Sequence, residues 1–294
     1  MLRSSNPILS KRDAFTPAAP QYGQAQYGQT PYGQSPYGQT GFQPYPPQGQ
    51  QQPGYPQHPT GAPMRPTSDS EGRMTLDDVV TKTAVTMGVL VATAALAWRF
   101  IPDTLAFPAM ILSALVGFVA VLIVSFRRVV SPPMVLFYAA VEGVFIGMIS
   151  EVFEGYYPGI VAQAVVATFF AAGATLAAYK FFNIRVTPKF RKVVFISTIS
   201  FAALMLVNFV FSLATGSGGL RGGIVGPVSL MAVGISLIAI VLAVLNLVLD
   251  FDYIEQGVAM GAPARESWRG AFGLTVTMVW LYIEMLRLIS YLRR

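Results

Sequence analysis

The stretch TVTMVWLYIEMLRLISYL, from Thr275 to Leu292, is apolar enough to lie in a lipid bilayer, yet Glu284 stands in the middle of it. A charged side chain at the centre of the hydrocarbon costs about 2.5–3.5 kcal/mol on insertion scales, and such residues usually face a bundle interior and a partner. The sequence therefore predicts a helix packed inside a membrane bundle, a partner for the carboxyl group, and a function that uses protons or cations.

The rest of the chain divides into a polar segment and a series of apolar runs. Of its 294 residues, 53% are hydrophobic and 12% are charged, which is about half the charged fraction of a soluble domain. Residues 21–40, QYGQAQYGQTPYGQSPYGQT, lack the side chains that build a core. We expect a disordered cytoplasmic tail over residues 1–73, either a simple solvated extension or a multivalent partner-binding segment. A membrane domain is expected over residues 74–294.

Seven segments are long and apolar enough to cross a bilayer, for which about 20 residues are needed. They cover residues 84–100, 106–126, 133–153, 160–182, 193–214, 225–249 and 271–291. Upstream of the first segment, Thr75 has the side chain of an N-cap, and Asp77 and Asp78 would lie in the first helical turn. The predicted fold is an all-α integral membrane protein, a bundle of seven transmembrane helices.

Basic residues in the loops predict the orientation of the bundle. Nine lie on the side of the amino terminus: Arg127, Arg128, Lys180, Arg185, Lys189, Arg191, Lys192, Arg265 and Arg269. Four lie on the opposite side: Arg99, Arg221, Arg293 and Arg294. Because loops rich in Lys and Arg stay in the cytoplasm, we expect a cytoplasmic amino terminus and an external carboxyl terminus in the cell (plasma) membrane. Topology also accounts for the net charge of +6, so no nucleic-acid partner is predicted.

Residue types that many enzymes need are missing from the membrane segments. The chain has no cysteine, and its one histidine is His58, in the tail. Thiolate or histidine metal sites and a Ser-His-Asp triad are therefore excluded there. The chain also lacks a serine-protease motif and the Gly-x-Gly-Asp motif of aspartyl intramembrane proteases. We predict no enzyme activity and no cofactor.

The third segment carries an acid near its middle. Glu142 is followed by Gly143 and Gly147, which share one helix face. Small residues four apart let two helix backbones approach closely. Glu142 is therefore either a hydrogen-bonding residue at a helix contact or a residue of an ion pathway.

Two further acids, Asp250 and Asp252, lie at the end of the sixth segment. They are two residues apart and would point in nearly opposite directions on a helix, so only one is expected to face the bundle interior. Either both mark the end of the helix, or one meets Glu284 on the antiparallel neighbour. Glu284 has a second candidate partner in Arg287, one turn further on. Two carboxyl groups at one site share protons and, when ionised, can bind Ca²⁺ transiently.

Three motifs resemble those of one family. FYAAVEGVFIG (137–147), LDFDYIEQG (249–257) and LYIEMLRLIS (281–290) resemble, in this order, the third, sixth and seventh helices of the Bax inhibitor family, the transmembrane Bax-inhibitor-motif proteins. The opening LRSSNPILSKR (2–12) is similar to actinobacterial members. The resemblance implies a seven-helix bundle with the last helix at its centre, and a pH-sensitive calcium leak in a bacterial plasma membrane.

The resemblance also implies site residues. Two hydrogen-bonded acids on the sixth and seventh helices govern the leak in the family, and here they fall on Asp250 and Glu284. The basic residue of the family's second helix has no match within residues 106–126, so Arg127 and Arg287 are the candidate ion-pair partners. The alternative that the family implies is a non-conducting regulator of membrane proteins, such as a modulator of a membrane-bound AAA protease, and a partner-binding tail would suit it.

Overall fold

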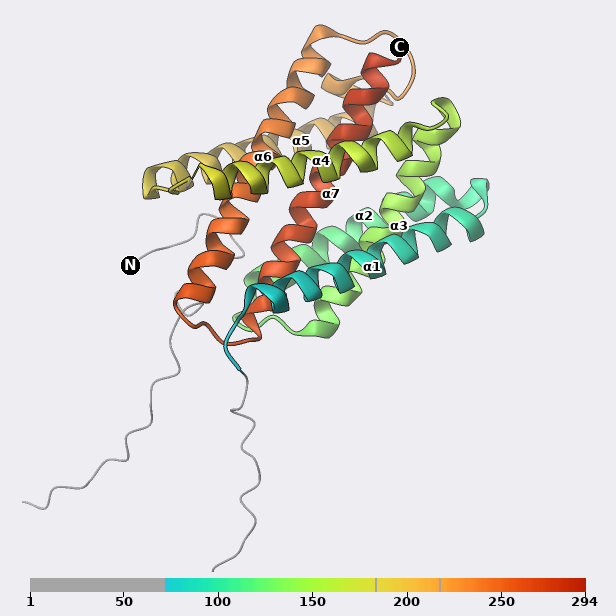
Figure 1. The fold of residues 1–294 in the computed structure, drawn as a ribbon. Coiled ribbons are helices and arrows are strands. Elements are labelled where there is room, and N and C mark those ends of the chain that lie inside the picture. Colours follow the sequence, from blue (N-terminus) through green and yellow to red (C-terminus); the bar gives the residue numbers. More distant parts are fainter. Residues whose placement is uncertain (1–71, 183, 217) are drawn as a thin grey trace, which may run out of the picture. The chain divides into compact units, whose positions relative to one another are not determined.

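The computed structural model describes residues 72–182, 184–216 and 218–294. In these ranges the elements follow in the order α1 (Leu76–Phe100), α2 (Asp103–Phe126), α3 (Pro132–Tyr156), α4 (Ile160–Phe181), α5 (Pro188–Thr215), the short 3-10 helix η1 (Gly219–Arg221), α6 (Leu230–Ala259) and α7 (Glu266–Leu292) (Figure 1). All seven α-helices are long and apolar enough to cross a membrane, so the predicted fold is confirmed. The predicted disordered tail lies outside the described residues, except for Gly72 and Arg73.

Side-chain caps fix several helix starts. Thr75 is the N-cap of α1, as predicted, and its Oγ1 accepts a hydrogen bond from the backbone N–H of Asp78 at 3.1 Å. Asp77 and Asp78 lie in the first turn, where the helix dipole favours negative charge. Ser229 caps α6 in the same way, accepting from the N–H of Ala232 at 3.0 Å.

The boundaries of α6 and α7 differ from those predicted for the last two spans. α6 begins at Leu230 and not at residue 225, because Gly226 has a φ of 106°, which a right-handed helix does not allow. α6 then continues to Ala259, so Asp250 and Asp252 lie well inside it. α7 begins at Glu266, which places Arg269 in its first turn. Arg269 is therefore a helix residue and not the loop residue that the charge count assumed.

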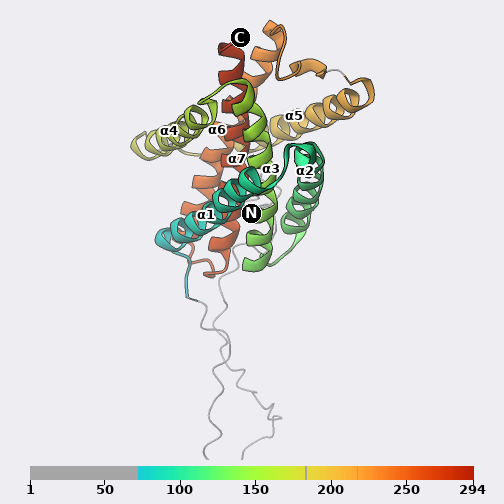
Figure 2. The ribbon, with the colours of Figure 1, turned by 90° about the vertical axis from the view of Figure 1, so that its right-hand side faces the viewer.

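α7 is the central helix, as the resemblance implied. It packs against α1, α3, α4 and α6, and Figures 1 and 2 both show it running through the group. Half of its most apolar stretch is buried, against 6% for α5. In the described part of the chain α5 packs only on α6 and η1. The bundle therefore has a well-packed centre and one lightly attached helix.

Two glycines let α1 and α3 touch. A Cβ atom on Gly143 would lie 2.4 Å from the carbonyl oxygen of Leu90, and one on Gly147 would lie 2.4 Å from that of Ala94. Neither position has room for a side chain, so the two backbones are in direct contact. This contact fixes α3, and with it the acid Glu142.

The start of α1 is tied to the turn between α6 and α7. The N–H of Met74 donates to the carbonyl of Ala262 at 2.7 Å, and that of Ala264 donates to Gly72 at 2.8 Å. We call this end of the bundle, which holds the α6–α7 turn, the N end. The opposite end, which holds η1 and Arg294, is called the C end.

Candidate functional site

Four acids are buried on α6 and α7: Glu266 in the first turn of α7, and three that lie further inside the helices. Asp252, Asp250 and Glu284 have exposed fractions of 7%, 2% and 3%. They follow one another from the N end towards the C end, because α6 and α7 run in opposite directions through the bundle. Within the residues described, no group of three or more acidic or histidine side chains is arranged to hold a metal ion.

Asp250 lies at the contact between α6 and α7. Thr277 Oγ1 donates a hydrogen bond to Asp250 Oδ2 at 2.7 Å. Gly273, one turn earlier on α7, brings the two helices close, since a Cβ atom there would lie 3.3 Å from Asp250 Oδ1. Gly273 therefore leaves space for the Asp250 carboxyl group, and the Thr277 hydroxyl donates a hydrogen bond to it.

Asp252 points to α5 instead. Arg191, in the first turn of α5, donates from Nη2 to Asp252 Oδ2 at 2.5 Å, and Gln256 Nε2 donates to the same oxygen at 2.7 Å. The prediction that only one of the two aspartates faces the interior is therefore wrong. They do point to different sides of α6, but α7 covers one side and α5 the other.

A polar cavity of about 440 Å³ lies beside Asp252. It is lined by Tyr179, Lys180, Ile184, Arg185, Val186, Asp252 and Glu255. Tyr179 donates its hydroxyl hydrogen to Glu255 Oε2 at 2.6 Å. The cavity therefore combines acidic and basic groups from α4, α6 and the loop between α4 and α5.

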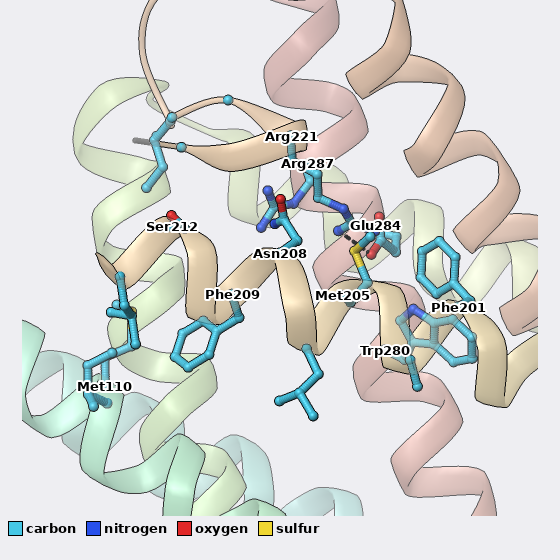
Figure 3. Close-up of a pocket in the computed structure, with 18 of the residues that line it drawn as sticks. Met110, Phe201, Met205, Asn208, Phe209, Ser212, Arg221, Trp280, Glu284 and Arg287 are labelled. Carbon is cyan, nitrogen blue, oxygen red and sulfur yellow. Dashed lines mark hydrogen bonds and ion pairs between the residues drawn. The ribbon is translucent and has the colours of Figure 1, made fainter. Parts of the chain in front are cut away.

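Glu284 is paired with an arginine from the loop before α6. Arg221 Nη1 donates to Glu284 Oε1 at 2.7 Å (Figure 3). Arg221 is itself only 7% exposed. Its backbone carbonyl accepts a hydrogen bond from the hydroxyl of Tyr291 at 2.8 Å, and its guanidinium lies 5.5 Å from the centre of the Phe201 ring. The loop thus inserts a cation into the bundle.

Glycines allow this loop to fold back. Gly216, Gly219, Gly222 and Gly226 have φ values of 65°, 59°, 67° and 106°. These backbone conformations are accessible to glycine at little cost and are rarely adopted by other residues. The glycine-rich loop before α6 is therefore a shaped support for Arg221.

The described ion pair of Glu284 is with neither of the two arginines predicted as its partners. Arg287 lines the same cavity as Glu284, but the ion pair of Glu284 is with Arg221. Arg127 is exposed just after the end of α2, at the N end of the bundle. One signal in the sequence pointed to Arg221, because it is the only charged residue in a loop of glycines.

The structure does not bring Asp250 and Glu284 together. Asp250 lies beside Gly273 and Thr277 of α7. Glu284 follows Thr277 by two helical turns, about 10 Å of rise. The expected shared site of two acids is therefore replaced by two separate sites, one with Thr277 and one with Arg221.

Glu142 is half-buried between α2 and α3. Gly117 of α2 leaves space for it, since a Cβ atom there would lie 2.8 Å from Glu142 Oε2. Gly143 and Gly147 face the other way, towards α1. Glu142 therefore belongs to a helix contact of its own, outside the series of acids on α6 and α7.

Sequence reasoning also missed a buried cluster near the N end. Arg269 is fully buried, and its Nε donates to Glu266 Oε2 at 2.6 Å. Its Nη2 donates to the carbonyl of Arg128 at 2.6 Å, and the hydroxyl of Tyr253 donates to Glu266 Oε2 at 3.3 Å. Arg269 thus joins the first turn of α7 to α6 and to the loop after α2.

The family comparison agrees with this architecture. No curated protein matches the chain. A family model described as Bax inhibitor 1 like matches residues 6–294. The match covers almost the whole length and includes all seven helices with Asp250, Asp252 and Glu284. The chain therefore belongs to the Bax inhibitor 1 like family.

Proposed function

We propose that this protein is a pH-sensitive cation leak of the cell membrane, with calcium as the cation, and that Asp250 and Glu284 control it. The proposal places the N end of the bundle at the cytoplasm. It includes neither an enzyme activity nor a cofactor. The observation that supports it most is the series of buried carboxylates Asp252, Asp250 and Glu284 inside α6 and α7, because ionisable residues inside a membrane bundle mark ion or proton pathways.

Cavities on both sides of Asp250 support a pathway. The cavity of about 440 Å³ reaches Asp252, and another of about 1080 Å³ reaches Glu284. Asp250 lies between these two levels, at the closely packed contact with Gly273 and Thr277. In this proposal the contact is the closed part of the pathway, and a cation moves from one carboxylate to the next when it opens.

The ion pairs provide the response to pH. Protonation of Glu284 removes its charge and with it the attraction for Arg221, so the η1 loop is released from α7. Protonation of Asp250 removes the charge from its hydrogen bond to Thr277, and charge-assisted hydrogen bonds are the stronger kind. Acid therefore weakens the links that hold α7 in place, and the leak should increase as the pH falls.

Flux measurements on the purified full-length chain test the proposal. The protein is placed in liposomes that hold a calcium dye, and calcium entry is followed from about pH 8 to about pH 5.5. Asp250→Asn and Glu284→Gln keep the polarity but remove the charge, so each should flatten the pH response. Asp77→Asn, which changes an exposed acid, is the matched control and should behave like the unaltered chain.

The same measurements identify a failure. If neither Asp250→Asn nor Glu284→Gln changes the flux at any pH, the acids do not control a leak. If the unaltered chain admits no calcium at all, the non-conducting regulator becomes the better proposal. Proton flux measured with a pH dye in the same liposomes separates a calcium leak from a proton leak.

A further inference from the structure

A cavity of about 1080 Å³ lies between α2, α5, η1 and α7 (Figure 3). Most of its wall is apolar. Phe107, Met110 and Ile111 line it from α2, and Met205, Leu206 and Phe209 line it from α5. A cavity of this size can take a large part of an amphiphile, and its wall matches hydrocarbon.

The cavity opens sideways, between two helices. In residues 72–182, 184–216 and 218–294, α5 packs only on α6 and η1 and makes no contact with α2. Phe107 and Leu206, on the two sides of the opening, are exposed. α5 is strongly inclined to α7 in both views (Figures 1 and 2). The side of the entrance between α2 and α5 is therefore flanked by exposed apolar side chains, as expected of a surface that meets lipid, while glycines of the η1 loop line the cavity at the C end.

The inner end of the cavity is positively charged. Arg221, Arg287 and Glu284 line it together, so two cations share it with one anion. Burial lowers the pKa of Arg221 from its ordinary value, Glu284 raises it, and the charge of Arg287 lowers it. A guanidinium remains protonated under such conditions. The excess charge is thus positive.

Several donors at this end have no hydrogen-bond acceptor among the described residues. They are Arg221 Nε and Nη2, on a side chain more than nine-tenths buried, and Arg287 Nε. Buried N–H groups in folded proteins are nearly always hydrogen-bonded. One acceptor at this end, Glu284 Oε2, also has no partner among the described residues, so unpaired donors outnumber unpaired acceptors by three to one. This excess of charged donors fits an acceptor with several oxygens, and a phosphate accepts from arginine in a two-bond geometry.

We propose that this cavity binds an anionic phospholipid, with its phosphate on Arg221 and Arg287 and its acyl chains against α2 and α5. The lateral entrance and the apolar wall favour a lipid over a free anion. Arg287 lies little more than one turn from the end of α7, close to the level where a span meets the lipid headgroups. The proposal does not depend on the leak and has a readout other than flux.

Trp280 provides that readout. It lines the cavity and stacks on Phe201 with ring centres 6.0 Å apart. In the full-length chain, Trp98→Phe and Trp268→Phe leave Trp280 as the one remaining tryptophan of three. Lipids with brominated acyl chains quench a tryptophan that they touch. Quenching is measured with brominated phosphatidylglycerol and with brominated phosphatidylcholine, each against a background of unbrominated phosphatidylcholine in detergent micelles.

The proposal predicts opposite effects for two variants. Brominated phosphatidylglycerol should quench Trp280 at a mole fraction well below that needed for phosphatidylcholine. Arg287→Gln removes one charge-assisted hydrogen bond and should reduce this preference about tenfold. Glu284→Gln removes the competing carboxylate from Arg221 and should increase the preference. Arg99→Gln changes an exposed arginine in the last turn of α1, so it should leave the preference unchanged.

Three results would overturn the inference. Equal quenching by the two lipids would mean that only unspecific lipid covers this face. A loss in Arg99→Gln as large as that in Arg287→Gln would mean that the surface charge alone attracts the lipid. Displacement of phosphatidylglycerol by excess inorganic phosphate would mean that the site takes a free anion. If Arg287→Gln does not fold, a missing increase in Glu284→Gln overturns the proposal by itself.

Discussion

Replacing Arg221 by Gln should destabilise the bundle strongly at neutral pH. The guanidinium and the Glu284 carboxylate are 2.7 Å apart, and both side chains are more than nine-tenths buried. Removal of one partner from a buried ion pair typically costs about 3–5 kcal/mol, because the other charge stays buried without compensation. For a domain of this size, at about 2–4 °C per kcal/mol, the melting temperature in detergent should fall by about 6–20 °C.

The loss should depend on pH in a defined direction. Once Arg221 is replaced, the remaining penalty comes from the charge of Glu284. Protonation removes that charge, so the deficit of the Arg221→Gln variant should shrink as the pH falls. The double variant Arg221→Gln/Glu284→Gln has no unpaired charge and should be more stable at neutral pH than Arg221→Gln alone. Melting curves of these variants, recorded at several pH values, measure both effects.

A contrary outcome is easy to recognise. If the double variant loses the sum of the two single losses, the two side chains do not interact. Arg99→Gln is the matched control, because it changes an exposed arginine near the same end of the bundle and should alter stability by less than about 0.5 kcal/mol. A drop in the control as large as that in Arg221→Gln would show that the charge of this end, and not the buried pair, decides stability.

Two further predictions concern packing and orientation. Gly147→Ala should lower the melting temperature, at a cost of about 1–3 kcal/mol, because its Cβ atom would lie 2.4 Å from the carbonyl of Ala94; Gly155→Ala has no atom within 4 Å of the new Cβ and should not lower it. A reporter fused after Arg294 should be active only outside the cytoplasm, and activity confined to the cytoplasm would contradict the orientation that the loop charges predict.

The helices were predictable because their signals are local. A span is recognised from the length and hydropathy of one segment, and a cap such as Thr75 is recognised from the few residues that follow it. The direct contact of α1 and α3 at Gly143 and Gly147 has a local signal too, since the spacing of small residues is visible in one helix. The sequence of that helix does not show which other helix packs against the two glycines.

Partners of the buried acids were not predictable in the same way. Glu284 and Arg221 are 63 residues apart in the sequence, and Asp252 and Arg191 are 61 apart. Both arginines had been counted as topology signals near the membrane surface. The separation of Asp250 from Glu284 depends on how far α6 slides along α7. Tertiary packing determines this relative position of the two helices. Here Asp250 contacts Gly273 and Thr277, and Thr277 precedes Glu284 by two helical turns.

The central place of α7 has a consequence for the biogenesis of the protein. α7 is the last of the seven helices to leave the ribosome, yet α1, α3, α4 and α6 all pack against it. Until it enters the membrane, Arg221 has no Glu284 to pair with and Lys82 of α1 has no Ala264 carbonyl, 182 residues later, to bind. Before α7 inserts, the helices α1, α3, α4 and α6 therefore lack the packing partner that they share in the finished bundle. A chain stalled at this stage would expose charged groups and unfilled helix faces to the insertion and quality-control machinery of the membrane.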